Sequence, residues 1–186
     1  MANGLVSADR SVLVVVDIQE RLAAAMERAD RERVLRGARI LIERAARLSI
    51  PVIVTEQYPK GLGPTAAELI RHLSEGTPRI AKTTFSAMGT REFQSALEDT
   101  GRKEVVVTGM ESHVCVLQTA MELGAHGFSS FVAEDACCSR LERSHASAMD
   151  RLRSAGVAVT LVESVLFEWL RDARHEHFKT TSALIR

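Results

Sequence analysis

The stretch EVVVTGMESHVCV, residues 104–116, says more about fold and chemistry than any other part of the chain. It begins with an apolar run typical of a buried strand and turns at Gly109. It then reaches Cys115, where a helix over residues 114–123 is expected to begin. Strand, turn and helix in this order build a parallel α/β sheet, in which ligands bind outside the carboxyl ends of the strands. The Cys115 thiol is therefore expected at the ligand-binding edge of such a sheet.

Two other apolar runs end in residues that this thiol could use. Residues 12–16 (VLVVV) lead into Asp17, and residues 79–81 (RIA) lead into Lys82. Taken alone, each has a simpler explanation: a buried small hydrophobe for the cysteine, a helix cap for the aspartate and a solvated surface residue for the lysine. Their occurrence together, each at the end of a strand, favours a catalytic site.

Strand-like and helix-like segments alternate along the chain, which is typical of a parallel sheet covered by helices on both faces. Further strands are expected at residues 51–55, 129–135 and 157–161, and the first long helix follows Asp30 as a possible N-cap. We predict one three-layer α/β/α, Rossmann-like domain over residues 1–186, with a six-stranded, mainly parallel sheet. Its core comprises about residues 10–162, and residues 163–186 form a C-terminal helical segment.

Composition argues against several classes of protein. The 186 residues are 46% hydrophobic, and 24 basic residues balance 24 acidic ones, so nothing indicates nucleic-acid or anionic-membrane binding. No run approaches the roughly 18 apolar residues of a membrane span, and no signal peptide is evident. Three cysteines do not make a disulfide framework, so a reduced, cytoplasmic protein is expected. No glycine-rich phosphate loop is present, so no nucleotide cofactor is expected.

The three strand-end residues fit acyl transfer. A free thiol, with a pKa of about 8.5, is a weak nucleophile at neutral pH. A helix N-terminus and Lys82 would both favour the thiolate of Cys115. Asp17 could take the thiol proton and later give it to a leaving amine. Backbone N–H groups of residues 109–115 could form an oxyanion hole.

Four motifs make the chain resemble the isochorismatase-like cysteine hydrolase superfamily. They are VVVDIQ (14–19), AKTTFS (81–86), TGMESHVCV (108–116) and EDAC (134–137). The chain is most similar in appearance to the isochorismatase domain-containing proteins. With them it shares TEQ (55–57), GLGPT (61–65) and a C-terminal segment around Phe178.

The resemblance implies a role for each matching residue. Cys115 would be the nucleophile, Asp17 the general acid/base and Lys82 the group that lowers the thiol pKa. It also implies a cis peptide bond between Met110 and Glu111, which would turn the Glu111 N–H towards the oxyanion that the Cys115 N–H binds.

The same resemblance implies which side chains line the substrate pocket. These candidates are Gln19, Gln57, Tyr58 and Phe85. His113, two residues before the nucleophile, either contacts substrate or caps the helix.

Two differences from other members of the superfamily narrow the range of candidate substrates. Nicotinamidases of this superfamily bind a metal through histidines after the second strand, but residues 55–62 (TEQYPKGL) contain none. A metal-free site is therefore expected, and nicotinamide is a poor candidate substrate. True isochorismatases hydrolyse a vinyl ether and lack the cysteine, so Cys115 argues against that activity too.

The sequence thus predicts a hydrolase that cleaves a small amide or related C–N bond through a covalent thioester. One alternative is a catalytically idle, oligomeric binding protein of the same fold. Another is a thiol redox sensor that uses Cys115 or the adjacent pair Cys137 and Cys138. His175 and His177 resemble half a metal site, but no third ligand is evident, so a solvated pair is expected.

A homo-oligomer is expected from the C-terminal segment. After the last predicted strand it carries the apolar residues Val165, Leu166, Phe167, Trp169, Leu170, Phe178, Leu184 and Ile185. Such side chains can pack against the protein's own core or against another subunit. Members of the superfamily commonly form oligomers, so some residues after Leu161 are expected at a subunit contact.

Overall fold

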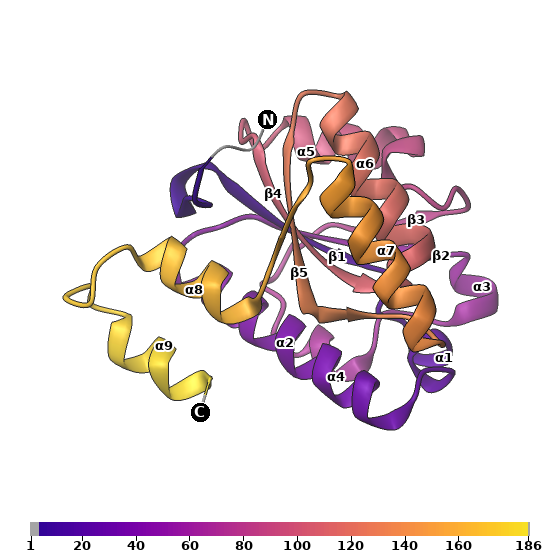
Figure 1. Ribbon diagram of the computed structural model, residues 1–186, viewed down its shortest axis with the longest axis horizontal. Coiled ribbons are helices and arrows are strands. Elements are labelled where there is room, and N and C mark those ends of the chain that lie inside the picture. Colours follow the sequence, from indigo (N-terminus) through magenta and orange to yellow (C-terminus); the bar gives the residue numbers. More distant parts are fainter. Residues whose placement is uncertain (1–3, 186) are drawn as a thin grey trace.

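A parallel sheet forms the centre of the molecule (Figure 1). The computed structural model describes residues 4–185. Its six strands follow the order β3-β2-β1-β4-β5-β6, and each neighbouring pair is parallel. The strands are β1 (Ser11–Val16), β2 (Val52–Gln57), β3 (Arg79–Lys82), β4 (Glu104–Met110), β5 (Ser129–Cys138) and β6 (Ala158–Thr160). The predicted α/β class and six-stranded sheet are confirmed.

Helices connect the strands and follow the last one. They are α1 (Glu20–Ala24), α2 (Arg28–Arg47), α3 (Pro59–Leu62), α4 (Ala67–Ile70), α5 (Arg91–Glu98), α6 (Leu117–Ala125), α7 (Glu142–Ser154), α8 (Val162–Leu170) and α9 (Phe178–Leu184). Short turns of 3-10 helix, η1 (Ala8–Arg10) and η2 (Ala87–Gly89), and a π-helical turn, η3 (Ser112–Val116), complete the elements.

The start of α2 differs from the prediction. Glu27, not Asp30, is the N-cap, because the Glu27 carboxylate accepts hydrogen bonds from the N–H groups of Ala29 and Asp30. Asp30 lies inside the helix and pairs with Arg33 at 2.6 Å. The helix therefore begins about one turn earlier than predicted, with the Glu27 carboxylate as its cap.

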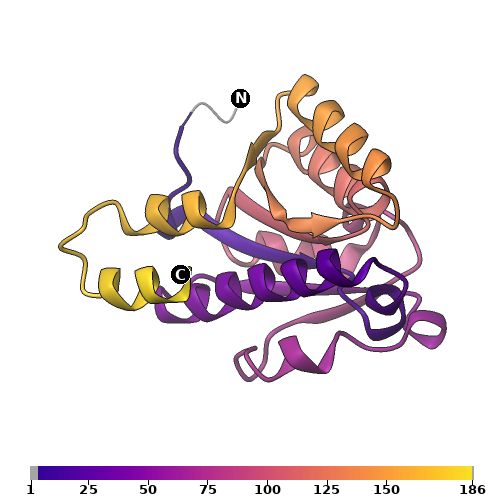
Figure 2. The ribbon, with the colours of Figure 1, turned by 60° about the horizontal axis from the view of Figure 1, so that its bottom comes forward.

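Two hydrophobic clusters hold the three layers together. Helices α2, α4 and α8 pack on one face of the sheet, and α5, α6 and α7 pack on the other (Figure 1, Figure 2). Successive side chains of a strand point to opposite faces, so Leu13 and Val15 of β1 join the first cluster while Val12, Val14 and Val16 join the second. Burial on both faces explains why β1 is an uninterrupted apolar run.

The C-terminal segment packs largely on the protein's own core. Helix α8 buries Val165, Leu166 and Trp169, and the Trp169 indole Nε1 donates to the Ser11 hydroxyl at 2.9 Å. Trp169 is 3% exposed, so it is unavailable for the subunit contact that the sequence suggested for this segment. A loop that projects on the left of Figure 1 joins α8 to α9. The ring of Phe178 in α9 lies beside that of Phe167 in α8, with 6.0 Å between their centroids.

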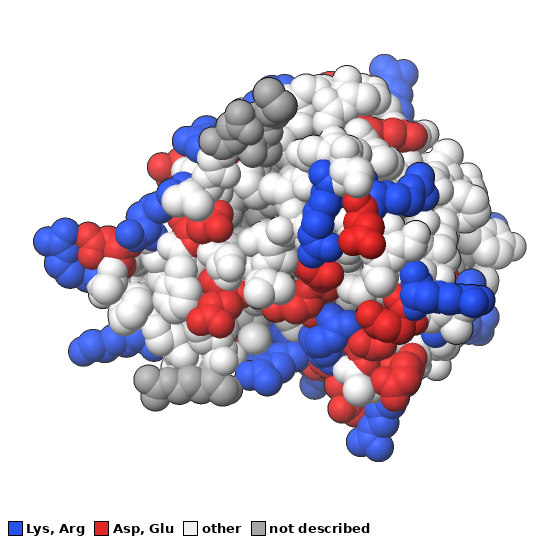
Figure 3. Space-filling view, in the orientation of Figure 1, with Lys and Arg blue, Asp and Glu red and all other residues white. Residues whose placement is uncertain are grey.

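The surface carries mixed charge. On the face shown in Figure 3, acidic and basic side chains are interspersed. Among residues 4–185, no helix is both long enough and apolar enough to cross a membrane.

Candidate active site

The three predicted catalytic residues meet at the carboxyl edge of the sheet. Asp17 follows β1 directly, Lys82 is the last residue of β3, and Cys115 lies in η3, just after β4. Strands β1 and β4 are neighbours at the point where the strand order reverses direction, which is where open α/β sheets bind ligands. The Asp17 and Lys82 side chains have no exposed surface, and Cys115 is 5% exposed.

Asp17 and Lys82 form a buried ion pair. The Lys82 Nζ lies 2.7 Å from Asp17 Oδ2, and the Thr55 hydroxyl donates to Asp17 Oδ1, also at 2.7 Å. Both carboxylate oxygens therefore have a donor, which offsets the cost of burying the charge. Asp17 also has a left-handed backbone (φ +52°), a conformation that aspartate tolerates better than most residues.

Only a long side chain can make this contact from β3. Strand β2 lies between β3 and β1, which puts about 10 Å between the two outer backbones. On its way the Lys82 ammonium also donates to Gln57 Oε1 at 2.7 Å and to the Phe85 carbonyl at 2.9 Å. These contacts fix the ammonium in one place.

Cys115 interacts with both members of the pair. Burial raises the pKa of its thiol to about 12, the Asp17 carboxylate acts in the same direction, and Lys82 opposes them. Lys82 opposes the rise in the thiol pKa, but burial and Asp17 outweigh it. A pKa this high keeps the thiol protonated at neutral pH, beside the Asp17 carboxylate.

The pocket candidates fall into two groups. Gln19 is buried, and its amide bonds to the backbone of Gln57 and Gly63, so it holds the loop after β2 in place. Tyr58 and Phe85, by contrast, are each 54% exposed. They follow β2 and β3, next to the residues that hold Lys82.

Gln57 and His113 each have a partner in the protein. The Gln57 amide accepts from Lys82 and donates to the Thr83 carbonyl at 2.8 Å. His113 Nδ1 lies 2.9 Å from the Ser139 hydroxyl. Gln57 thus helps to hold Lys82 in the candidate triad of Asp17, Lys82 and Cys115, and His113 joins the turn before Cys115 to Ser139.

Sequence reasoning missed Thr55, the second donor to Asp17. The signal that selected Asp17 and Lys82 applied to it as well, because Thr55 closes the apolar run of the second strand. In the turn between β4 and Cys115, the peptide bond between Met110 and Glu111 is cis.

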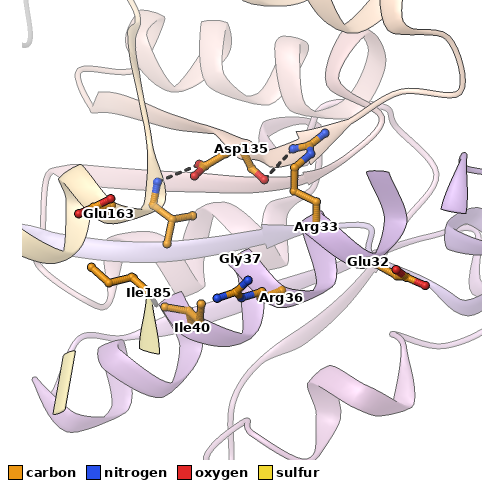
Figure 4. A pocket seen from close by; sticks show the side chains of 9 residues that line it. Glu32, Arg33, Arg36, Gly37, Ile40, Asp135, Glu163 and Ile185 are labelled. Atoms are coloured by element: carbon orange, nitrogen blue, oxygen red, sulfur yellow. Dashed lines mark hydrogen bonds between the residues drawn. The ribbon is translucent and has the colours of Figure 1, made fainter. Parts of the chain in front are cut away.

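Two of the surface clefts, each of about 500 Å³, concern the site and the start of α8. One lies at the end of β3 and is lined in part by Tyr58, Lys60, Lys82 and Arg91, but neither Asp17 nor Cys115 lines it. The other lies between α2 and the start of α8, away from the triad (Figure 4). There the Asp135 carboxylate accepts from the Val162 N–H at 2.8 Å and so caps α8 (Figure 4). Within residues 4–185, no group of three or more His, Cys, Asp or Glu side chains is arranged to hold a metal ion.

Comparison with known families gives a match over most of the chain. The model of the isochorismatase domain matches residues 11–164, which run from β1 into α8 and include all three triad positions. The chain belongs to the isochorismatase family.

Other family members match over nearly the whole chain. Isochorismatase domain-containing protein 2 of Danio rerio is 37% identical over 98% of this chain and 90% of its own length. Isochorismatase family protein 1B of Dictyostelium discoideum is 32% identical over 95% and 86%, respectively. Among solved structures, MAR1 ribonuclease from Caenorhabditis elegans matches with a TM-score of 0.91 and 36% identity over 98% of this chain and 92% of that one.

Proposed function

We propose that this isochorismatase-family protein is a cysteine hydrolase of small amides or related C–N bonds. The observation that carries the proposal is the buried Asp17–Lys82 ion pair beside the Cys115 thiol. A buried ion pair is costly to keep and adds little net stability. A nucleophile, a base and a fixed cation are, however, the parts that acyl transfer needs.

The proposed reaction begins with the protonated thiol. As the Cys115 sulfur attacks the carbonyl carbon, its proton passes to Asp17, and Lys82 stabilises the negative charge that leaves the carboxylate and develops on sulfur. The tetrahedral intermediate collapses when the C–N bond breaks, and Asp17 returns the proton to the departing amine. Asp17 then takes a proton from a water molecule as the water oxygen attacks the thioester carbonyl. The C–S bond breaks, the acyl group leaves as a carboxylic acid, and Asp17 returns the proton to the Cys115 thiolate. Asp17, Lys82 and Cys115 together therefore carry no net charge in either the resting site or the thioester.

We infer the remaining roles from the same arrangement. The N–H groups of Glu111 and Cys115 would bind the oxyanion. The exposed rings of Tyr58 and Phe85 would contact the substrate at the mouth of the site. Gln19 and Gln57 would hold the loop and the ammonium, and His113 would act through Ser139. No metal or other cofactor takes part in these steps.

We further propose how the protein exists in the cell. Residues 1–186 would act as one domain within a homo-oligomer. All three cysteines are free thiols, which suits a reducing cytoplasm.

Cleavage of RNA, the activity in the name of the C. elegans relative, is the competing function. Binding the RNA backbone requires a concentration of basic side chains. Here 24 basic residues balance 24 acidic ones, and both signs are interspersed on the face in Figure 3. We therefore favour the small amide over RNA.

The test is ammonia release from a panel of primary amides and ureido compounds. Cys115→Ala should abolish release, whereas Cys138→Ala, which removes another buried thiol, should retain it. Rapid acid quenching and mass spectrometry should find the acyl group on Cys115. Full activity of Cys115→Ala would refute the nucleophile assignment.

Two further arms address the alternatives. Chelation with EDTA should leave ammonia release unchanged, and a loss that zinc or iron restores would contradict a metal-free mechanism. Incubation with single-stranded and structured RNA should give no cleavage, and cleavage that Cys115→Ala abolishes would favour the ribonuclease.

A further inference from the structure

Three consecutive side chains before the nucleophile contact one distant segment. We call residues 111–115 the nucleophile loop and residues 139–145 the clamp segment. Glu111 Oε2 accepts from the Arg140 N–H at 2.9 Å and from the Arg140 Nε at 3.1 Å. Ser112 Oγ lies 2.8 Å from His145 Nδ1, and His113 lies against Ser139. Every side chain from Glu111 to His113 therefore has its partner in the clamp segment.

The contacts differ in how deeply they are buried. Ser112 has no exposed surface and His145 is 7% exposed, so their hydrogen bond is shielded from water. The Arg140 side chain is 62% exposed, while the Glu111 side chain that it contacts is 9% exposed. Arg140 thus contacts the nucleophile loop at the protein surface, and His145 contacts it in the interior.

The inner contact is itself supported. Burial lowers the pKa of His145, which keeps the imidazole neutral at physiological pH. Its other ring nitrogen, Nε2, lies 4.0 Å from Glu134 Oε1, and Glu134 also pairs with Arg153. The buried ring therefore has Ser112 at one nitrogen and the Glu134 carboxylate near the other.

We propose that Arg140 and His145 are positioning residues, which hold Cys115 at the attacking distance and angle. This inference rests on the proposed function, because it assigns the clamp segment a role in that same reaction. Neither residue forms a hydrogen bond or ion pair with Asp17, Lys82 or Cys115. Displacements of about 1 Å at a reacting atom can cost about a hundredfold in rate. A loop released from its clamp would lose the alignment of the thiol with Asp17.

Release of the nucleophile loop should slow turnover but make the Cys115 thiol more reactive towards alkylating reagents. Burial and the Asp17 carboxylate raise the pKa of Cys115, and Lys82 is the cation that opposes them. A displaced loop admits water and moves the thiol away from these groups, so its pKa should fall towards the ordinary value. Alkylation at neutral pH should then become faster while turnover becomes slower.

The test combines turnover with alkylation of Cys115. In the full chain, Arg140→Ala and His145→Leu should lower kcat by about 10-fold to 100-fold and change KM less than about twofold. Iodoacetamide should alkylate Cys115 about 5- to 10-fold faster at pH 7.5, as mapped by mass spectrometry. Its alkylation-versus-pH profile should shift to lower pH.

Two control variants separate positioning from general damage. Arg143→Ala changes an exposed arginine on α7 whose guanidinium forms no hydrogen bond or ion pair with the described residues, so both readouts should be unchanged. His145→Asn should restore kcat to within about threefold of wild type, because the amide can replace Nδ1 as the partner of Ser112.

The outcomes are distinct. Values of kcat and alkylation within twofold of wild type in Arg140→Ala would overturn the proposal, even if His145→Leu failed to fold. Equal losses in His145→Leu and His145→Asn would overturn the role of the hydrogen bond. Failure of the proposed function would appear differently: the wild type would release no ammonia and form no acyl-Cys115. The alkylation profiles would still show whether the clamp holds the thiol.

Discussion

At the scale of single residues, Asp17 has the most demanding environment. Its carboxylate is fully buried between the Lys82 ammonium and the Thr55 hydroxyl. The hydroxyl bond should be worth more than an average hydrogen bond, because bonds to a charged group are about twice as strong as neutral ones. Thr55 therefore supports the Asp17 carboxylate even though it has no part in the proposed proton transfers.

Thr55→Val should destabilise the protein. The substitution keeps the shape and removes the donor to Asp17, so the free energy of unfolding should fall by about 1.5–3 kcal/mol. Urea unfolding measures this change. Thr160→Val, in β6, is the control and should shift the value by less than about 0.5 kcal/mol. Equal effects of the two substitutions would contradict the importance of the bond.

The buried thiol of Cys137 makes the fold sensitive to alkali. Burial raises the pKa of Cys137, so the folded state favours the neutral thiol. This contribution is complete below the ordinary thiol pKa of about 8.5 and is lost as the pH rises from there towards the folded-state value. From pH 8 to pH 10, stability should fall by up to about 2 kcal/mol through this group.

Urea unfolding at pH 8, 9 and 10 checks the alkaline loss. Cys137→Ala should show a shallower decline than the wild type, because the titrating thiol is gone. The comparison uses the slope with pH, so any constant packing loss in the variant cancels. Parallel curves for the two proteins would contradict the prediction.

At the scale of elements, the close approach of β1 and β4 brings Cys115 near Asp17. Gly109 has a φ of +144°, and a Cβ there would lie 2.0 Å from the Val16 carbonyl oxygen. Val16 immediately precedes Asp17, and Gly109 begins the turn that leads to Cys115. The glycine thus allows the two strand ends to lie side by side.

Gly109→Ala should therefore damage both stability and activity. Backbone strain and the clash together should cost about 2–4 kcal/mol and separate Asp17 from Cys115. Gly124→Ala is the matched control, because it lies in α6 with no atom within 4 Å of a new Cβ. It should be neutral or stabilising by up to about 1 kcal/mol. Thermal unfolding and ammonia release measure both effects. Equal results for Gly109→Ala and Gly124→Ala would show that the close approach at Gly109 is not required.

At the scale of the whole molecule, the C-terminal segment has two sides. Trp169 and its neighbours complete the core, whereas Phe167, Phe178 and Leu184 are only partly buried. The same segment thus closes the domain and leaves apolar surface outside it. We retain the proposal that residues after Leu161 contribute to a subunit contact, with Trp169 excluded.

Light scattering at micromolar concentration should report at least a dimer. A particle of 20.4 kDa would contradict this expectation. Trp169 is the sole tryptophan and is buried within its own subunit, so its emission should not change when dilution separates the subunits. A red shift on dilution would show instead that Trp169 lies at the contact.

Much of this protein could be derived from local patterns. Uninterrupted apolar runs predict strands buried on both faces, and such strands are parallel and covered by helices. Strand ends must then meet at one edge, so Asp17, Lys82 and Cys115 could be grouped before their contacts were known. The periodicity of a strand or helix is set by its own backbone, which is why sequence alone determined the class of fold and the candidate triad.

Other features were decided only by the tertiary structure. The clamp between Glu111 and Arg140 joins residues 29 positions apart, and Trp169 meets Ser11 across 158 positions. The pKa of Cys115 follows from burial by the surrounding core, which outweighs the effect of Lys82. Local pattern carries no information about which side chains meet across such separations, or about how much water they lose when they do. Those depend on how all the layers pack together.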